Sequence, residues 1–209
     1  MKPWMSLYPF LVIMLFFSCR KDEITAPKVE DYFPLKVGNQ WKYDVFRINE
    51  DGEQFVTTQS VKVIDERNIG GERWFELSVP RDLEFFFSKF VRVDNGQLID
   101  PQRRVLLTLD IGDQVFSQDT IYLSNDLHFN PLALIDRQVG PVRKTINVEA
   151  GEYSCLEVIN TIHAFPGSFV EERMSFDHYR QGVGLVQKNV ITLFNTEIRE
   201  IRLESFHLK

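Results

Sequence analysis

The stretch Gln40-Trp41-Lys42-Tyr43-Asp44-Val45 gives the strongest indication of the fold, because its side chains alternate strictly between polar and apolar. A β-strand points successive side chains to opposite faces of a sheet. A period of two therefore predicts a strand with one buried and one solvated face. Just upstream, Pro34 fixes a bend and Gly38-Asn39 supplies a turn into this strand.

Further short strands and tight turns follow along the rest of the chain. Turn signals rich in Asn, Asp, Gly and Pro separate the candidate strands, at 49–52, 68–71, 94–96, 149–151, 166–167 and 182–184. The last segment, 196–208, again alternates, with Ile198, Ile201 and Leu203 set among charged residues. Ten or so such strands predict an all-β fold, an antiparallel meander that forms a strongly curved sheet, a half-barrel or a barrel.

One region departs from this pattern, near residues 118–141. It contains Asn125-Asp126, Asn130-Pro131 and Gly140-Pro141, which all favour irregular backbone. We expect a long irregular segment here, with one short helix from Leu132 to Arg137. Long loops often carry function, so this segment is also a candidate for functional structure.

The chain begins with a leader that consists of Lys2 and an apolar run from about Leu7 to Phe17. About ten apolar residues suit a signal peptide and fall short of the ~20 needed to span a bilayer. The run ends in Ser18-Cys19, and four charged residues, 20–23, follow directly. This arrangement resembles the lipobox of bacterial lipoproteins. It predicts a signal peptide over 1–18 and a lipidated N-terminal Cys19. The alternatives are an ordinary secretory signal and an uncleaved anchor.

The predicted organisation after cleavage is a lipidated tether over 19–31 and a single β domain over 32–209. Several acyl chains on Cys19 would hold the protein on a membrane, which is therefore its first predicted partner. Lys21-Asp22-Glu23 resembles the surface-export signal of Bacteroidetes lipoproteins. We expect an outer-membrane lipoprotein in the cell envelope, facing the periplasm or the cell surface.

Composition narrows the partners and the redox chemistry. The formal net charge is −6, and it becomes −7 when Lys2 leaves with the leader. This acidic balance, without any run of Lys or Arg, argues against nucleic acid as a partner. Once Cys19 is lipidated, Cys155 is the only remaining thiol, so we expect no disulfide within the chain. Its apolar neighbours favour a buried structural thiol over a catalytic or redox residue.

Three segments together resemble a group of Bacteroidetes envelope lipoproteins of unknown function. They are 31–43, with the pattern YFPL-x-x-GN-x-W-x-Y; 148–158, with V-x-AG-x-Y-x-C-L-x-V; and 179–186, with Y-x-x-GVGLV. A similar kind of motif occurs in periplasmic β-proteins that are classed only as a domain of unknown function. The resemblance implies a curved sheet or half-barrel like that of lipoprotein carriers and lipocalins. It implies structural roles for Trp41 and Tyr43 in the core, and for Gly182 and Gly184 at a tight bend.

We find no catalytic or metal-binding constellation in the sequence and predict no cofactor. The four histidines, His128, His163, His178 and His207, lack HxH or HxxxH spacing. No nucleophile elbow is present, and no phosphate-binding glycine loop. The adjacent acids 171–172 point to opposite faces of a strand, so they favour cross-strand ion pairs over acid–base catalysis.

The best binding candidates are aromatic. Phe85, Phe86 and Phe87, with Phe90 close behind, would place rings on both faces of a strand. They predict either a strand buried on both sides, or the lip of a hydrophobic cavity or a partner-docking patch. Trp74 either packs in the core or is exposed and stacks on a sugar ring.

These observations predict a non-enzymatic, membrane-anchored lipoprotein that binds an apolar small molecule or an envelope protein on a curved sheet. The first alternative is a structural or interaction subunit of an envelope assembly. The second is a glycan-processing enzyme that uses two carboxyl groups in a cleft.

Overall fold

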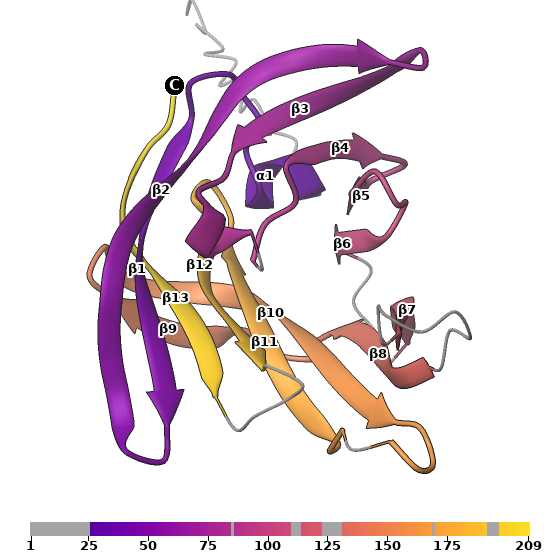
Figure 1. The fold of residues 1–209 in the computed structure, drawn as a ribbon. Coiled ribbons are helices and arrows are strands. Elements are labelled where there is room, and N and C mark those ends of the chain that lie inside the picture. The colour runs from indigo at the N-terminus through magenta and orange to yellow at the C-terminus, as the bar shows by residue number, and fades with distance from the viewer. Residues whose placement is uncertain (1–25, 85, 110–113, 123–130, 169, 192–196) are drawn as a thin grey trace, which may run out of the picture.

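The computed structural model describes residues 26–84, 86–109, 114–122, 131–168, 170–191 and 197–209. Their secondary structure is one short helix, α1 (Val29–Tyr32), one 3₁₀ turn, η1 (Arg81–Leu83), and thirteen strands (Figure 1). The strands are β1 (Gln40–Asn49), β2 (Gly52–Ile69), β3 (Glu72–Ser78), β4 (Phe90–Asp94), β5 (Gln97–Ile99), β6 (Val105–Thr108), β7 (Val115–Tyr122), β8 (Pro131–Val139), β9 (Lys144–Val148), β10 (Gly151–Ala164), β11 (Arg173–Arg180), β12 (Gly184–Ile191) and β13 (Ile198–His207).

The strands form one strongly curved antiparallel sheet that nearly closes into a barrel. Its order is β6-β5-β4-β3-β2-β1-β13-β12-β11-β10-β8-β7, and every pairing in the described residues is antiparallel. The two edge strands, β6 and β7, follow each other in sequence, so the chain runs around the sheet and leaves one seam between them (Figure 1). The predicted all-β meander is thus confirmed.

The pairing of β1 with β13 joins the two ends of the domain. In its register Tyr43 lies opposite Leu203 and Val45 opposite Ile201. All four side chains are at most 4% exposed, so the two alternating patterns read from the sequence meet on one buried face. The same register places the charged residues of both strands on the opposite face, where Lys42 pairs with Glu204 at 3.1 Å.

The prediction of an irregular segment near 118–141 is wrong for its described part. Residues 115–122 form β7 and residues 131–139 form β8, so the predicted helix from Leu132 to Arg137 is a strand. The pair is tied by a 2.9 Å hydrogen bond from Gln118 to Asp136 and by an ion pair of Arg137 with Asp119. Both strands carry half-buried side chains on each face. Apolar and polar residues therefore do not alternate along them, and the sequence lacks the period of two that would predict a strand. Residues 123–130 lie outside the described residues.

Strands β8 and β9 follow one another along the same edge of β10. Val139 pairs with Val158 and Lys144 with Cys155, so the break at 140–143 falls in the middle of β10. Gly140 keeps the break close to the sheet, because its amide donates to the Glu157 carbonyl at 2.8 Å. The two strands thus act together as one long, interrupted partner of β10.

The packed part of the chain begins slightly earlier than predicted. Val29 and Tyr32 of α1 are each 1% exposed, so Val29, assigned to the tether from sequence, packs in the core, whereas Glu30 and Asp31 are exposed. The backbone of Asp31 is held by the amide of Gly182, at 2.6 Å from its carbonyl oxygen. Residues 1–25, with the predicted signal peptide and Cys19, lie outside the described residues. None of the described helices is long and apolar enough to cross a bilayer.

A cluster of aromatic hydrogen bonds joins β1 to the turn between β11 and β12. The indole Nε1 of Trp41 donates to the carbonyl oxygen of Val183 at 2.6 Å, and the Tyr43 hydroxyl donates to that of Leu185 at 3.0 Å. Trp41 and Tyr43 are fully buried, and Phe33 stacks on Trp41 with ring centroids 5.3 Å apart. Two of the three sequence motifs therefore meet at this contact, and we call it the Trp41 clamp.

Glycine at 184 is required by both conformation and space. Its φ of +117° is one that other residues rarely adopt, and a Cβ there would lie 2.8 Å from Trp41 Nε1. Gly182 also has a positive φ, +75°. These values explain why the motif contains glycine at both positions, as the sequence indicated.

The clamp yields a stability prediction for Gly184→Ala. Gly52 has a φ of +114°, and a Cβ added there would have no atom within 4 Å, so Gly52→Ala is a matched control for backbone strain alone. We expect Gly184→Ala to lower the free energy of unfolding by about 2 kcal/mol or more beyond the effect of Gly52→Ala. Urea unfolding followed by tryptophan fluorescence measures both. Equal losses would show that the contact with Trp41 contributes nothing.

Candidate ligand-binding cavities

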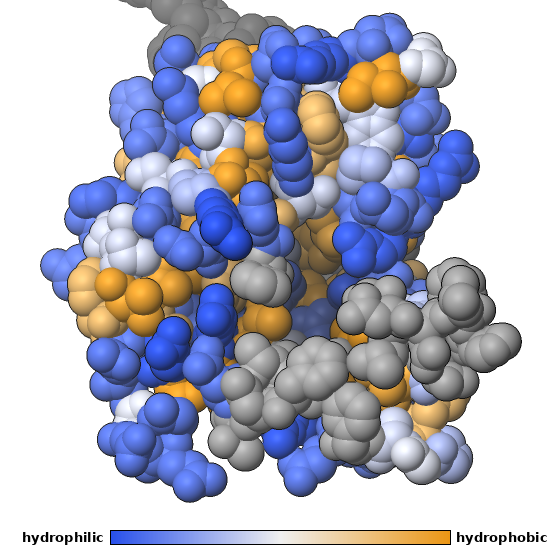
Figure 2. Space-filling view, viewed as in Figure 1, coloured by the Kyte–Doolittle hydropathy of each residue, from blue (hydrophilic) through white to orange (hydrophobic). Residues whose placement is uncertain are grey.

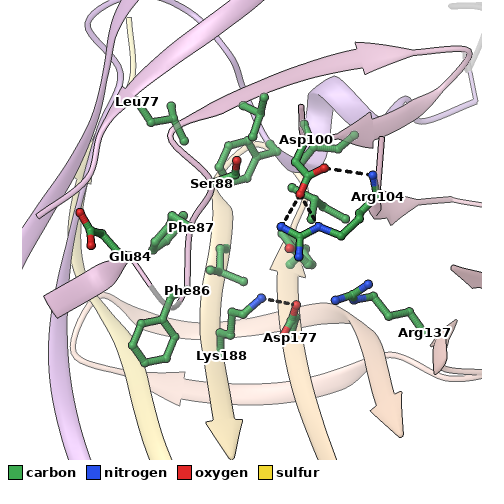
Figure 3. A pocket seen from close by; sticks show the side chains of 16 residues that line it. Leu77, Glu84, Phe86, Phe87, Ser88, Asp100, Arg104, Arg137, Asp177 and Lys188 are labelled. Carbon is green, nitrogen blue, oxygen red and sulfur yellow. Dashed lines mark hydrogen bonds and ion pairs between the residues drawn. The ribbon is translucent and has the colours of Figure 1, made fainter. Parts of the chain in front are cut away.

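The concave side of the sheet is not filled solid by side chains. A cavity of about 170 Å³ lies between the clamp and the strands β4–β6. Its apolar wall includes Phe33, Leu77, Phe86, Phe87, Leu98 and Leu185. Figure 2 shows this face of the molecule hollowed near its centre, with hydrophobic residues inside the hollow. Figure 3 shows the side chains around it.

A second cavity, of about 280 Å³, lies beside the first, between β7, β8 and β10–β12. Four aliphatic side chains line it, Ile121 from β7, Ile135 from β8, Ile162 from β10 and Val190 from β12. Both cavities are lined by Arg137, Asp177 and Lys188. The two spaces therefore meet at these three charged residues, which separate the main core from a small apolar cluster around Ala133 and Ile162.

Asp177 is the centre of this polar layer and is only 2% exposed. Lys188 Nζ lies 2.8 Å from its Oδ2, and Asn160 Nδ2 lies 3.3 Å from its Oδ1. Figure 3 shows the Lys188 ammonium meeting the Asp177 carboxylate, with Arg137 directed toward them from β8. Arg137 is itself held by Asp119 through Nη1. We call Arg137, Asn160, Asp177 and Lys188 the polar belt.

A second buried acid, Asp100, lines the opposite wall of the first cavity. It is fully buried, and its Oδ1 accepts the amides of Gln102 and Arg104 at 2.9 and 3.0 Å. Its Oδ2 lies 2.6 Å from both Nε and Nη2 of Arg104. Four N–H groups therefore satisfy this carboxylate, which fixes the turn between β5 and β6 and holds Arg104 at the cavity.

An outer pocket adjoins the first cavity at Phe87. A surface pocket of about 270 Å³ shares Leu77, Glu84 and Phe87 with it and is also lined by Ile64 and Val79. Phe87 packs against Tyr43, with ring centroids 5.4 Å apart. The residues just after η1 thus form the wall between the interior and this outer pocket.

The predicted aromatic cluster falls partly on this wall. Phe86 and Phe87 line the first cavity, in a turn after η1, so the expected strand across these residues is wrong. The chain turns here because the amides of both residues donate to the Leu83 carbonyl, at 2.9 and 3.1 Å. Phe90 begins β4, half-buried, and the Lys89 ammonium lies 5.7 Å from its ring. Phe85 lies outside the described residues.

Trp74 lies on the outer face of β3 and is 7% exposed. The Arg92 guanidinium covers its ring, 5.1 Å from the centroid. Arg92 in turn pairs with Glu72 and Asp94, each at 2.9 Å. The indole therefore faces away from both cavities, beneath a charged layer rather than in the core.

Sequence reasoning missed the polar belt altogether. Its residues come from β8, β10, β11 and β12, and each is an ordinary polar residue in its own strand. On β11, Ser175, Asp177 and Tyr179 face inward, whereas the more apolar Met174 is 57% exposed. Hydrophobicity alone thus points to the wrong face of this strand, and no local signal corrects it.

The histidines and paired acids are scattered over the described structure. His178 Nε2 lies 3.2 Å from Glu157 Oε2, and His163 Nε2 lies 3.3 Å from Asp136 Oδ2. Glu171 pairs with Arg173 at 2.7 Å. Within the described residues no group of three His, Cys, Asp or Glu side chains could hold a metal ion. His128 lies outside them.

Burial keeps the acidic hydroxyl and thiol groups of the core protonated. It raises the pKa of Tyr43 and of Tyr179 well above the usual value, and for Tyr179 the charge of Asp177 adds to the effect. Burial also raises the pKa of the Cys155 thiol to about 11. Cys155 is free and fully buried, as expected for a structural thiol.

Comparison with known proteins adds little to this description. No protein-family model matches the sequence, and no curated protein matches it significantly. The chain is similar to a solved structure from Bacteroides fragilis described as an exported protein with a YmcC-like fold, at 12% identity, a TM-score of 0.44, and coverage of 83% of this chain and 97% of that one. It is also similar to a protein from Parabacteroides distasonis described as a lipoprotein, at 13% identity, a TM-score of 0.39, and coverage of 84% and 98%.

The raised pKa of Cys155 predicts slow thiol chemistry. At pH 8, a thiol with a pKa of about 11 is far less ionised than an unfolded cysteine with a pKa of about 8.5. In a Cys19→Ala chain we expect Ellman's reagent to react at least about a hundredfold more slowly with the folded protein than with protein in urea. Similar rates in both states would contradict a buried thiol.

The same shift predicts a pH dependence of stability. Because the pKa of Cys155 is raised on folding, its contribution is fully present below the unfolded pKa and is lost as the pH rises from about 9 through about 11. Cys155→Ala should therefore make the fall in unfolding free energy over this window shallower, as measured by urea titrations.

Proposed function

We propose that this chain is a membrane-tethered, non-enzymatic binding protein that holds an apolar small molecule inside its curved sheet. One observation carries the proposal, the two interior cavities that meet at the polar belt. Concave pockets are the usual form of small-molecule sites in proteins. Together the cavities reach the lower end of the range of small-molecule sites, roughly 300–1,000 Å³.

The walls of the cavities suit such a ligand. Apolar side chains form most of the wall of the second cavity, whereas polar and apolar groups share the wall of the first cavity. Binding sites usually combine an apolar surface with a few polar groups in this way. The outer pocket is separated from the first cavity by the side chain of Phe87, which would have to move for a ligand to enter from there.

An enzyme that uses paired carboxylates is a poorer fit to this geometry. Asp100 accepts four N–H groups, and Asp177 is bonded to Lys188 and Asn160. These hydrogen bonds hold both carboxylates in fixed positions within the wall of the cavity. These two acids are therefore better suited to hold the architecture of the cavity.

A role as an interaction subunit is the second candidate, and the outer face of β2 favours it. Phe55 and Val56 are 55% and 48% exposed, and Ile64 and Ile69 on the same strand are also exposed. Exposed apolar side chains along one strand can form a contact surface. A partner at Phe55 and Val56 is compatible with a ligand in the cavities, because neither residue lines them.

The tether is part of the proposal and depends on Cys19. Acyl chains on this residue would hold the domain on the outer membrane, facing the periplasm or the cell surface. The folded domain begins at α1, close behind the tether, so the cavities would be carried near the bilayer.

Replacing Cys19 tests the tether. A Cys19→Ala chain expressed in a bacterium that processes lipoproteins should incorporate no labelled palmitate and should leave the membrane fraction. The parent chain should incorporate label and sediment with membranes. Unlabelled parent chain would overturn the lipid anchor.

Filling the second cavity tests ligand binding. Val190→Trp places a large side chain in the space lined by the three isoleucines, so it should weaken binding of decanol by at least about tenfold. Val56→Trp adds the same side chain on the exposed outer face and is the matched control. Isothermal titration calorimetry gives the affinities, and circular dichroism checks that both variants are folded.

Unchanged binding in a folded Val190→Trp variant would place the ligand elsewhere. Native mass spectrometry of the parent chain purified from its own envelope provides an independent measurement. A co-purified small molecule that is lost from Val190→Trp but kept in Val56→Trp supports the interior site.

A further inference from the structure

We propose that the polar belt recognises an anionic head group, so that the ligand is a single-chain amphiphile with a carboxylate or phosphate at one end. The head would bind at Arg137 and Lys188, and the chain would occupy the isoleucine-lined second cavity. This inference rests on the proposed function and specifies its ligand class.

The energetics of the belt point to recognition rather than stability. Asp177 is 2% exposed, and the side chains of Lys188 and Arg137 are only 20% and 16% exposed. Removing such charges from water costs several kcal/mol per ion, and well-packed apolar residues in their place are often neutral or stabilising. Charges placed where the aliphatic second cavity meets the more polar first cavity are therefore better explained by a polar group that they bind.

The hydrogen-bonding capacity of the belt favours an acceptor-rich group. A lysine ammonium has three N–H donors and a guanidinium five, whereas the carboxylates beside them only accept. Lys188 meets one oxygen of Asp177, whose other oxygen faces Asn160. Arg137 contacts Asp119 and Ser117, both through Nη1. Arg137 and Lys188 each carry further N–H groups besides the ones that meet Asp119, Ser117 and Asp177, and a carboxylate or phosphate can accept hydrogen bonds from such groups.

The arrangement of the two cations suits one shared anion. Figure 3 shows Lys188 from β12 and Arg137 from β8 reaching toward the Asp177 carboxylate from opposite sides. Arg104, anchored by Asp100, lines the first cavity on the opposite wall, with a side chain 46% exposed. An oxyanion beside these cations would be attracted to them, and it would compete with Asp177, Asp119 and Asp100, which already pair with them.

The apolar part of the ligand has one clear place. Ile121, Ile135, Ile162 and Val190 line the second cavity and adjoin the belt at Arg137 and Lys188. A single chain of moderate length fits this space better than the paired chains of a phospholipid. The head group would then lie at the belt, toward the first cavity.

Decanoate, decyl phosphate, decanol and inorganic phosphate distinguish the contributions of head and chain. We titrate each into the full chain at pH 7 by isothermal titration calorimetry. The expected result is binding of decanoate or decyl phosphate at least about tenfold tighter than decanol, with inorganic phosphate the weakest. The tighter of the two anions identifies the head group.

Variants of the belt test whether Arg137 and Lys188 are responsible. Lys188→Met is combined with Asp177→Asn, and Arg137→Met with Asp119→Asn, so that no buried acid is left unpaired. Each pair should remove most of the preference for the anion over decanol, measured as the ratio of the two affinities in the same variant. Arg137→Lys keeps the charge and should keep the preference. Lys42→Met, in an exposed ion pair on the outer face, is the matched control.

The outcomes separate this inference from the proposed function. Equal affinity for decanol and both anions overturns the anionic head group but leaves an apolar-ligand protein. An anion preference that survives in both folded double variants also overturns it. If none of the amphiphiles binds the folded parent chain, the proposed function itself fails.

Discussion

The Trp41 clamp organises the whole sheet. It joins residues 142 positions apart in the sequence, through a buried N–H group and a buried carbonyl that would otherwise be unsatisfied. A buried donor or acceptor without a partner costs about 1–3 kcal/mol, so the clamp favours one arrangement of β1 against the β11–β12 turn. That arrangement also sets the position of β13 between them, and therefore the closure of the sheet from its two ends.

The clamp divides the barrel into a solid part and a hollow part. Around it, α1, Phe33, Trp41 and Tyr43 fill the interior, and these three aromatic side chains are at most 3% exposed. Toward the other end, the charged residues of the polar belt keep apolar side chains from closing the space. The cavities therefore lie next to a rigid core, and a rigid core is what holds the walls of a binding site in place.

Charged side chains cover the outside of the sheet where the inside is well packed. On β3, four consecutive residues from Trp74 to Leu77 are buried, although only Phe75 and Leu77 belong to the core. Arg92 covers Trp74, and Arg67 and Lys89 pair with Glu76. A long basic side chain can bury apolar surface beneath its stem and still keep its charge paired. Trp74 is therefore covered by the side chain of Arg92 and is not exposed for stacking on a sugar ring.

Local sequence was enough to establish most strands, the turns and the buried face at the domain's two ends. The alternation of Trp41, Tyr43 and Val45, the glycine turns and the glycine at 184 are local properties that backbone sterics and burial impose. Long-range packing determined the pairing of β7 with β8. It also determined that Phe86 and Phe87 lie in a turn and line the first cavity. It also brought Arg137, Asp177 and Lys188 together, because their strands are neighbours through distant pairing and the inward face of β11 is the more polar one. Alternation along a strand shows which side chains share a face, but it does not show which of the two faces lines a cavity.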